Sequence, residues 1–296
     1  MDAKLEAFLA VCEEKSFTKA ASKLDLTQPA VSQHIKQLEA DYGVKLFNRR
    51  NNEMVLTNEG KILYKYAEKI QNLYFELEKK IRDTSNNRNG LVVGVTHTSE
   101  SNIAPDIFAE YASRHVDTHL RIISDSTKNL FDKLSDYLID LAIIEGQVAP
   151  KKFSSILLGK DSLVAVLSIN HPLAGQSHIT LEELKKEKLI LRSLESDTTN
   201  LFVSELEKLN ISIDDFVISL ETDNVASIKD LVRQNYGVSI LPKSACMREV
   251  KEGTLKLLDI HDLKLVRETF LVYLKDNIDQ EILNDIALIY REKIVD

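Results

Sequence analysis

The stretch LTQPAVSQHIKQLEADYG, residues 26–43, contains the start, body and end of a short amphipathic helix. Thr27 can cap this helix, and Pro29 is tolerated in its first turn because the N–H groups there have no partner within the helix. At 100° per residue, one side of the helix is apolar, with Val31, Ile35, Leu38 and Tyr42. The other side carries Pro29, Ser32, Gln33, Lys36 and Gln37. The pattern predicts a helix that packs on one side and presents amides, a hydroxyl and a lysine on the other.

Two shorter elements precede this helix. Apolar residues at helical spacing predict a helix over residues 2–14, and Ser16 can cap a second helix that runs to Leu24. A tight turn over 25–27 leads into the quoted stretch. Helix, short helix, turn and helix is the arrangement that lays its second element in the major groove of DNA.

A β-hairpin is predicted after the helix, in the stretch LFNRRNNEMVLT, residues 46–57. Its turn falls at Asn51 and Asn52, because asparagine tolerates positive φ. Arg49 and Arg50 lie on its first strand, in the position of the wing of a winged helix-turn-helix.

The basic charge of the chain is concentrated in this region. Residues 15–50 carry seven Lys or Arg against three Asp or Glu, whereas the whole chain of 296 residues has a formal net charge of −8. A local basic patch in an acidic chain indicates a nucleic-acid contact confined to one end. A patch of this size is also compatible with an ordinary solvated face.

The composition indicates a soluble globular protein of two or three compact units, with 44% hydrophobic and 28% charged residues. No apolar run approaches the length of a membrane span, and the N-terminus lacks the basic segment of a signal peptide. Cys12 and Cys246 are far apart, which favours neither a disulfide framework nor a thiolate metal site. We therefore expect a cytoplasmic protein.

A long helix is predicted from about residue 58. Its apolar residues step by three or four, close to a heptad seam, and are Leu63, Tyr66, Ile70, Leu73, Leu77 and Ile81. The seam favours pairing with a second copy of the chain, although a helix packed on its own domain is the alternative. The polar stretch DTSNNRNG, residues 83–90, is predicted to end the helix as a linker.

Short aliphatic runs alternate with helical patterns beyond this linker. The runs predict strands at 91–96, 120–124, 140–146, 162–168, 188–192, 216–221, 237–241 and 269–274. The helical patterns lie at 103–114, 127–138, 181–187, 198–209, 224–235 and 278–293. This alternation is typical of parallel α/β architecture, and its length fits two lobes that share a cleft.

The N-terminal motifs resemble those of LysR-type transcriptional regulators. The resemblance rests on SFTKAA, on LDLTQPAVSQHIKQLE, on GVKLFNR and on LTNEG, and continues more sparsely in LIDLAIIEG, NHPLAG and GVSILP. It covers essentially the whole chain. It implies an α/β protein with an N-terminal winged helix-turn-helix (1–58), a linker and dimerisation helix (59–89) and a two-lobed effector-binding domain similar to periplasmic solute-binding proteins (90–296).

The resemblance also divides the effector-binding domain and names partners. Lobe I would comprise about 91–161 and 267–296, and lobe II about 162–266. The expected partners are double-stranded promoter DNA, a polar small-molecule effector and further copies of the chain in a homotetramer. RNA polymerase is a further partner that the resemblance allows. No cofactor and no metal are expected.

The candidate DNA-binding residues come from three elements. They are Thr18, Lys19, Thr27, Gln28, Pro29, Ser32, Gln33, Lys36, Arg49 and Arg50. Glutamine can bond an adenine edge in two places, lysine reaches guanine or phosphate, and hydroxyls suit phosphate contacts. Arginines on the wing would hold the DNA backbone or enter the minor groove. The alternative for any one of them is a solvated surface residue.

The candidate effector-binding residues are hydroxyls at strand ends and helix starts, where ligands of open α/β sheets bind. They are Thr96, Thr98, Ser99, Ser126, Thr127, Thr198 and Thr199. Ordinary helix capping is the alternative role for these residues. Many family members have a glycine-rich loop where this chain carries Glu195 and Asp197, which disfavours a plain inorganic anion and leaves room for a zwitterion or an amine-bearing ligand.

Enzymatic motifs such as G-x-S-x-G, H-E-x-x-H and the P-loop are absent from the sequence, so we expect no enzymatic activity. The main alternative is a soluble solute-binding or sensor protein whose N-terminal helices only assemble the oligomer, without specific DNA binding.

Overall fold

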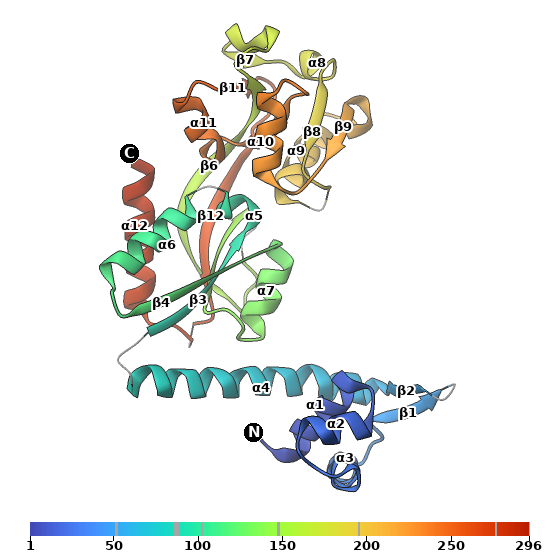
Figure 1. The fold of residues 1–296 in the computed structure, drawn as a ribbon. Helices are drawn as coiled ribbons and strands as arrows, with labels where there is room; N and C mark the ends of the chain where they lie inside the picture. Colours follow the sequence, from blue (N-terminus) through green and yellow to red (C-terminus); the bar gives the residue numbers. More distant parts are fainter. Residues whose placement is uncertain are drawn as a thin grey trace. The chain divides into compact units, whose positions relative to one another are not determined.

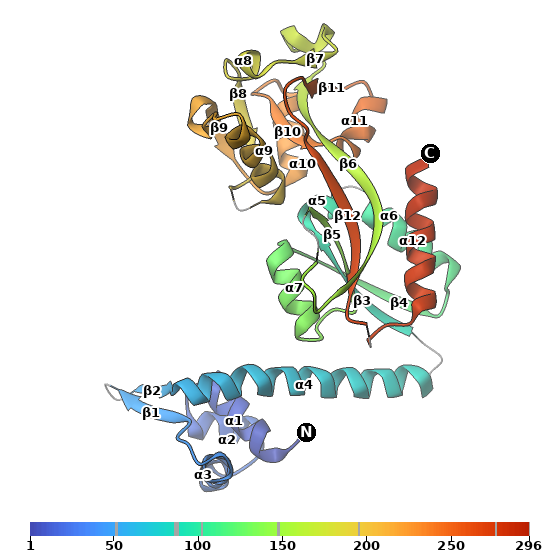
Figure 2. The same cartoon turned by 180° about the vertical axis from the view of Figure 1, so that it is seen from behind.

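The computed structural model describes residues 1–50, 53–85, 89–101, 103–146, 149–194, 196–275 and 277–295. It comprises two compact units, one formed by residues 1–87 with 136–138 and the other by residues 88–135 with 139–296. We call them the DNA-binding unit and the effector unit, after the expectation above. Figures 1 and 2 show their elements from opposite sides.

The DNA-binding unit is a helical bundle with a hairpin and a long helix (Figure 1). Its elements are α1 (Ala3–Glu14), α2 (Phe17–Lys23), α3 (Gln28–Tyr42), β1 (Phe47–Arg50), β2 (Glu53–Leu56) and α4 (Asn58–Ser85). The strands β1 and β2 are antiparallel. Apolar side chains of α1, α2, α3 and the first turns of α4 form one core. The helix-turn-helix and the hairpin predicted from the sequence are therefore present.

The helix α3 follows its predicted pattern except at its last residue. Thr27 caps it by accepting a hydrogen bond from the Ala30 N–H at 3.4 Å, and Gly43 ends it with φ of +67°. The predicted apolar side is buried at Val31, Ile35 and Leu38. Tyr42, however, is 59% exposed, so its assignment to the buried side is wrong. The helix ends at this residue and the chain turns at Gly43, so the regular packing of the helix stops there.

The LTNEG motif joins the hairpin to α4. The Thr57 hydroxyl donates to the Lys45 carbonyl at 2.7 Å and accepts the Gly60 N–H at 2.9 Å. A Cβ at Gly60 would lie 2.2 Å from the carbonyl oxygen of Leu46, closer than real contacts allow. The motif therefore fixes how α4 leaves the hairpin.

The helix α4 continues further than the sequence predicted. It runs to Ser85, and the next strand begins at Asn89, so the prediction of an irregular linker over 83–90 is wrong at both ends. Residues 86–88 lie outside the described part of the chain. Polar residues are compatible with an exposed helix end, because no buried face is required there.

The effector unit is built around one mixed sheet and a smaller parallel pair. The elements of its first lobe are β3 (Asn89–Thr96), α5 (His97–Glu100), α6 (Ala104–Arg114), β4 (Thr118–Asp125), α7 (Thr127–Ser135), β5 (Leu141–Gly146) and α12 (Gln280–Val295). Those of the second are β7 (His178–Ile179), α8 (Leu181–Leu184), β8 (Lys188–Leu191), α9 (Asp197–Lys208), β9 (Val217–Glu221), α10 (Val225–Arg233), β10 (Ser239–Pro242), α11 (Met247–Lys251) and β11 (Leu255–Ile260), with 3₁₀ turns η1 (Pro172–Gly175), η2 (Ile213–Asp215) and η3 (Ser244–Cys246). Two long strands, β6 (Ser154–Ser168) and β12 (Val266–Tyr273), run between the lobes (Figure 2).

The main sheet has the order β4-β3-β5-β12-β6-β11-β7, with β10 also paired to β6. The strands β3, β4 and β5 are parallel, but β12 is antiparallel to both β5 and β6. The expectation of a parallel sheet is therefore wrong for this part. Strand–helix alternation does not specify the direction in which the last strand returns, and β12 enters from the second lobe.

Successive side chains of a buried strand point to opposite faces of its sheet and pack into different hydrophobic cores. In β5, Leu141 and Ile143 pack with α6 and α12, whereas Ala142 and Ile144 pack with α7. In the second lobe, Leu189 of β8 packs with α9, and Ile190 packs with α10. Both faces are covered, which explains why these strands are continuous apolar runs.

Several elements were not predicted. The first half of β6, the strands β7 and β11, and the helices α5 and α11 were missed. The first half of β6 has only three consecutive apolar residues, Ile156 to Leu158, followed by Gly159, Lys160 and Asp161. Its pairing partner is β12, more than a hundred residues away in the sequence, and this pairing has no local sequence signal.

Candidate DNA-facing helix and interlobe cavity

The outward face of α3 carries the residues predicted to face DNA. Gln28, Pro29, Gln33 and Lys36 are exposed, and Ser32 is half-buried. The Gln28 amide donates to the Ser32 hydroxyl at 2.9 Å. One side of the helix therefore presents amide, hydroxyl and ammonium groups in a continuous row.

The helix α2, the start of α3 and the strand β1 carry the other predicted DNA-binding residues, and the structure describes the side chains of only some of them. Thr18 and Lys19 of α2 and Thr27 at the start of α3 are exposed. Lys23, the last residue of α2, pairs with Glu13 at 2.5 Å. The backbone of Arg49 and Arg50 lies on β1, but their side chains, like the whole of Asn51 and Asn52, fall outside the described part of the structure.

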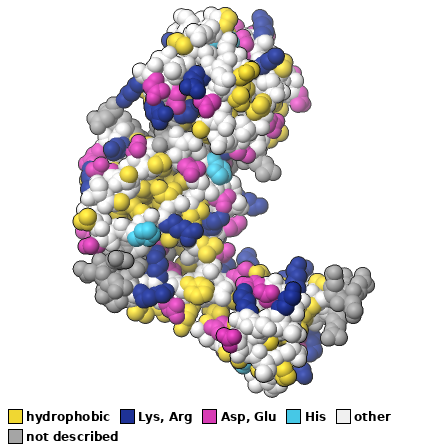
Figure 3. All heavy atoms as spheres, viewed as in Figure 1, with side chains coloured by type: hydrophobic (Ala, Val, Ile, Leu, Met, Phe, Trp, Pro, Cys, Tyr) yellow, Lys and Arg dark blue, Asp and Glu magenta, His cyan; other side chains and the backbone are white. Residues whose placement is uncertain are grey.

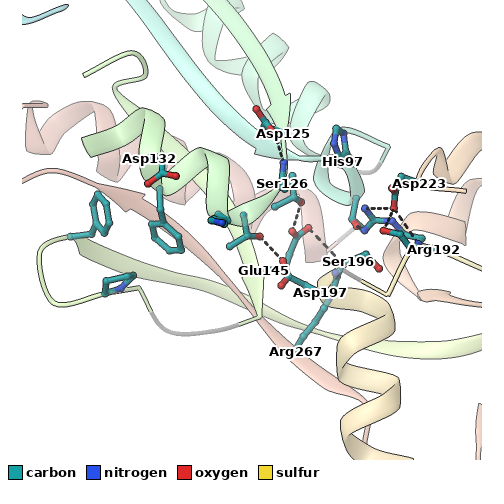
Figure 4. A pocket seen from close by; sticks show the side chains of 18 of the residues that line it. His97, Asp125, Ser126, Asp132, Glu145, Arg192, Ser196, Asp197, Asp223 and Arg267 are labelled. Carbon is teal, nitrogen blue, oxygen red and sulfur yellow. Dashed lines mark hydrogen bonds and ion pairs between the residues drawn. The ribbon is translucent and has the colours of Figure 1, made fainter. Parts of the chain in front are cut away.

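A cavity of about 870 Å³ lies between the two lobes of the effector unit (Figure 4). Its walls come from strand ends and helix starts of lobe I (β3, α5, β4, α7 and β5), from the ends of β8 and the start of α9 in lobe II, and from β12. Its lining includes Thr96, His97, Thr98, Asp125, Ser126, Thr127, Lys128, Phe131, Asp132, Glu145, Pro150, Lys152, Phe153, Arg192, Ser193, Ser196, Asp197, Asp223 and Arg267.

The predicted hydroxyls divide into two groups. Thr96, Thr98, Ser126 and Thr127 line the cavity. Ser99, Thr198 and Thr199 are buried and are not among the lining residues. Thr96 both lines the cavity and caps α5, accepting the Ser99 N–H at 3.1 Å, whereas the Thr199 hydroxyl donates to the Arg192 carbonyl at 3.0 Å.

Two hydrogen bonds cross the cavity from one lobe to the other. The Arg192 guanidinium, at the end of β8, donates through Nη1 to the Thr98 hydroxyl at 2.8 Å. The Thr127 hydroxyl, at the start of α7, donates to the Asp197 carboxylate at the start of α9. These contacts link lobe I to lobe II through polar groups that a ligand in the cavity could also bind.

Three buried charges form the inner wall. Glu145, Arg192 and Arg267 are only 3%, 7% and 5% exposed. The Glu145 carboxylate accepts hydrogen bonds from the hydroxyls of Thr96 and Ser99 and lies 3.6 Å from Arg267 Nη2. Burial of these groups is costly unless they are paired, which explains why the carboxylate collects two hydroxyls and a guanidinium.

The two guanidinium groups are incompletely paired. Arg192 Nη2 lies 3.6 Å from Asp223, the pair joined in Figure 4, and Arg267 Nη2 lies 3.7 Å from Asp161, distances longer than hydrogen bonds. The Nε atoms of both are buried without a hydrogen-bond partner among the described residues. Burial lowers the pKa of Arg192, and the Asp223 charge opposes this. An unsatisfied buried donor costs about 1–3 kcal/mol, so the cavity offers donors that a bound anion would satisfy.

The sequence was compared with known protein families. Residues 85–288 match the family model of the LysR substrate binding domain, and residues 3–61 match that of the bacterial regulatory helix-turn-helix protein, lysR family. An uncharacterized HTH-type transcriptional regulator of Methanocaldococcus jannaschii is 32% identical over 92% of this chain and 93% of its own length. The chain belongs to the LysR family of transcription regulators. It is a DNA-binding regulator with a substrate-binding domain.

Further relatives and solved structures agree with this LysR-type architecture. A probable RuBisCO transcriptional regulator of Trieres chinensis is 28% identical over 89% of this chain and 87% of that protein. The structure of full-length CbnR complexed with its target DNA has a TM-score of 0.69 at 17% identity and covers 98% of both chains. A mutant of OxyR from Corynebacterium glutamicum has a TM-score of 0.63 at 24% identity and covers 99% of this chain and 91% of that one. At these identities the two structures show a shared fold.

The charged residues of the LysR-type cavity were missed in the sequence, although a signal was present. Glu145 follows four buried residues of β5, and Arg192 follows the apolar run of β8. A charged residue at the carboxyl end of a buried strand is rarely placed there for packing alone. Arg267 had no such signal, because it lies at the start of β12 and reaches the cavity only through the antiparallel return of that strand.

Glu145→Gln is expected to destabilise the effector unit by about 3–5 kcal/mol, because it removes the charge that faces the buried Arg267 guanidinium. The measurement is urea-induced unfolding followed by circular dichroism. Glu268→Gln is the matched control: this carboxylate pairs with Lys160 at 3.0 Å on the surface of β12 and should cost less than about 1 kcal/mol. Equal losses for the two variants would contradict a structural role for the buried carboxylate.

Proposed function

We propose that this regulator binds promoter DNA as a homo-oligomer and adjusts that binding in response to a small polar effector held between its lobes. The observation that carries the proposal is the pair of hydrogen bonds, Arg192 to Thr98 and Thr127 to Asp197, that cross a cavity lined by incompletely paired buried charges. A ligand that binds these groups changes the contacts that hold the lobes at their present spacing.

The outward face of α3 supports sequence-specific DNA contact. Gln33 and Lys36 are exposed on the side opposite the buried Val31 and Ile35, so both can reach base edges when the helix lies in the major groove. Lys19 and Thr18 on α2 are placed to contact phosphates beside the groove. On the face shown in Figure 3, acidic and basic side chains of the effector unit are interspersed, in contrast to the basic excess of residues 15–50.

The apolar face of α4 supports the oligomer. Leu63 packs partly into the core of the DNA-binding unit, but the rest of the seam is open to solvent. The exposed side chains are Tyr66, Ile70, Leu73, Leu77 and Ile81, and Figure 3 shows hydrophobic atoms along this helix. An apolar stripe at heptad spacing on a 28-residue helix fits a second copy of the same helix. We propose a dimer through α4 and a tetramer as the complete assembly.

The interlobe cavity supports effector control by a shift between conformations. An effector can change the lobe arrangement only if it binds one arrangement more tightly than the other. The cavity meets this requirement because its walls come from both lobes, so its dimensions change when the lobes move. Effector binding would then alter how the paired DNA-binding units lie on a promoter, with RNA polymerase as a further partner.

No helix in the described part of the chain is long and apolar enough to cross a membrane. We propose a cytoplasmic regulator without enzymatic activity, because the site residues bind and bridge rather than pair a nucleophile with a base. A sensor without specific DNA binding is the second candidate, and the row of amide and ammonium groups on α3 disfavours it.

Gln33→Ala is expected to change the sequence preferred by the protein, because an amide that bonds a base edge contributes about 1–3 kcal/mol of discrimination. The measurement is selection of bound duplexes from a random pool with the full-length protein. Gln234→Ala, an exposed glutamine at the end of α10, is the matched control and should leave the preferred sequence unchanged.

Lys19→Ala, tested in the same selection, is expected to leave the preferred sequence unchanged, unlike Gln33→Ala. Loss of a phosphate contact weakens binding to all sequences alike and reduces the salt dependence of affinity by about one ion. An unchanged preference for Gln33→Ala would rule out base recognition by this residue. Failure of the wild-type protein to select any sequence would support the sensor alternative.

Leu73→Glu combined with Leu77→Glu is expected to convert the oligomer to a monomer, because both charges would be buried in the paired α4 helices at a cost that the seam cannot offset. Molar mass from light scattering after size exclusion measures the outcome. Lys61→Glu, nine residues before Ile70 and therefore on the opposite side of α4, is the control and should leave the mass unchanged. An unchanged mass for the double variant would place the oligomer contact elsewhere.

A further inference from the structure

We propose that the effector is a zwitterion of the amino-acid type, a small molecule that carries both an ammonium and a carboxylate group. The inference rests on the proposed function, which places the effector in the interlobe cavity. It follows from charges of both signs in the cavity wall that have incomplete ion pairing among the described residues.

Arg192 is the group that would bind the ligand carboxylate. It is buried, its Nε has no hydrogen-bond partner among the described residues, and its contact to Asp223 is longer than a hydrogen bond. Its Nη1 atom donates to Thr98, which leaves Nε and Nη2 to bind a ligand. A carboxylate can accept two parallel hydrogen bonds from a guanidinium. The buried Arg267, also with an unpaired Nε, adds positive potential on the same wall.

Asp197 is the group that would bind the ligand ammonium. One of its oxygens accepts the Thr127 hydroxyl, and no described cation lies within ion-pair distance of it. Glu145, in contrast, has both oxygens hydrogen-bonded and Arg267 beside it. Arg192 experiences the charges of Asp223, Glu145 and Asp197, so the carboxylate of Asp197 belongs to the same charge cluster as the guanidinium.

Ligands of a single sign leave part of this cluster unsatisfied. The described lining has five carboxylates, on Asp125, Asp132, Glu145, Asp197 and Asp223, against four cations, on Lys128, Lys152, Arg192 and Arg267. A plain anion at Arg192 would face the unpaired carboxylate of Asp197, and a plain amine at Asp197 would leave the donors of Arg192 unpaired. A zwitterion satisfies both. Phe131 and Phe153, whose ring centroids are 5.0 Å apart, supply an apolar wall for the rest of the molecule.

Each pole of such a ligand would compete with one bridge between the lobes. The carboxylate approaches the guanidinium that binds Thr98, and the ammonium approaches the carboxylate that binds Thr127. A zwitterion is therefore suited to change both interlobe contacts at once, which a ligand of one sign cannot do.

The test uses the full-length protein and sets of three matched compounds: an amino acid, the amine that lacks its carboxylate and the acid that lacks its ammonium. The sets cover the common α-amino acids, β-alanine and γ-aminobutyrate. We expect at least one amino acid to raise the melting temperature by about 3 °C or more at saturation. In calorimetry, its amine and acid analogues should bind at least about tenfold more weakly.

Variants locate the site. Asp197→Asn and Arg192→Lys should each weaken binding of that amino acid by about tenfold or more, because one removes the charge that binds ammonium and the other removes the bidentate fork. Asp259→Asn, an exposed carboxylate on β11 outside the cavity, is the control and should bind normally. The comparison of analogues on the wild-type protein remains decisive if Arg192→Lys does not fold.

Three results would overturn the inference: no amino acid binds, an acid or amine analogue binds as tightly as its amino acid, or binding survives both variants. Footprints on a bound promoter fragment distinguish a failure of the proposed ligand class from a failure of the proposed function. If acids without ammonium bind in the cavity and change the footprint, the ligand class is wrong and the proposed function stands. If an amino acid binds as expected and the footprint does not change, the ligand class stands and effector control is wrong.

Discussion

The effector unit depends on the burial of one carboxylate between two lobes. Glu145 is held by the hydroxyls of Thr96 and Ser99 and by the charge of Arg267, which in turn lies 3.7 Å from Asp161. Asp161 also accepts a hydrogen bond from the Ser244 hydroxyl at 2.5 Å. Residues of both lobes and of both connecting strands thus share one network, buried at Glu145 and Arg267 and half-buried at Asp161 and Ser244. Such networks are costly when any member is unpaired, so they fix the arrangement of the elements that supply them.

This network lies where the two lobes are joined. The strands β6 and β12 pair through Asp161 and Arg267, and the Leu163 N–H donates to the Leu265 carbonyl at 2.7 Å where the chain crosses between lobes. The network therefore lies at the two crossing points, where a change in lobe angle must be absorbed. The cavity opens on one side of it, with Arg192 and Asp197 contributed by the second lobe. Under the proposed function, a ligand there would act close to the two strands that join the lobes.

Local patterns predicted those elements whose packing is visible in their own sequence. The helix α3 was predicted with its cap, its buried side and its outward face, because a period of 3.6 specifies which residues share a face. The strands β5 and β8 were predicted from their apolar runs, because a strand that is buried on both faces is apolar at every position. The strand β11 was missed because its sequence, LKLLDI, alternates only in part: Leu257 and Leu258 are adjacent apolar residues. The first half of β6 and the antiparallel return of β12 depend on pairing between distant residues, which no local pattern encodes.

The effector-binding role of the predicted hydroxyls stays a prediction. Thr98 and Thr127, chosen because they lie at strand ends and helix starts, line the interlobe cavity. Thr198 and Thr199 follow Asp197 in the first turn of α9, and their side chains are buried in the protein and do not line the cavity. Sequence spacing alone does not show which side chains of this turn face the cavity. Arg192 was missed because a charged residue after an apolar run was interpreted only as the end of a strand, and Arg267 was missed because it lies at the start of β12, where the sequence carries no such signal. Their importance lies in burial and incomplete pairing, which only three-dimensional structure reveals.

If contacts across the interlobe cavity set the way the protein lies on DNA, Thr127→Val will change the DNase footprint on a promoter fragment captured by the wild-type protein. This substitution removes the hydrogen bond to Asp197 and leaves the DNA-binding unit unchanged. We predict the same preferred half-site sequence with a footprint of altered length or an affinity changed by about threefold or more. An identical footprint and affinity would contradict the account.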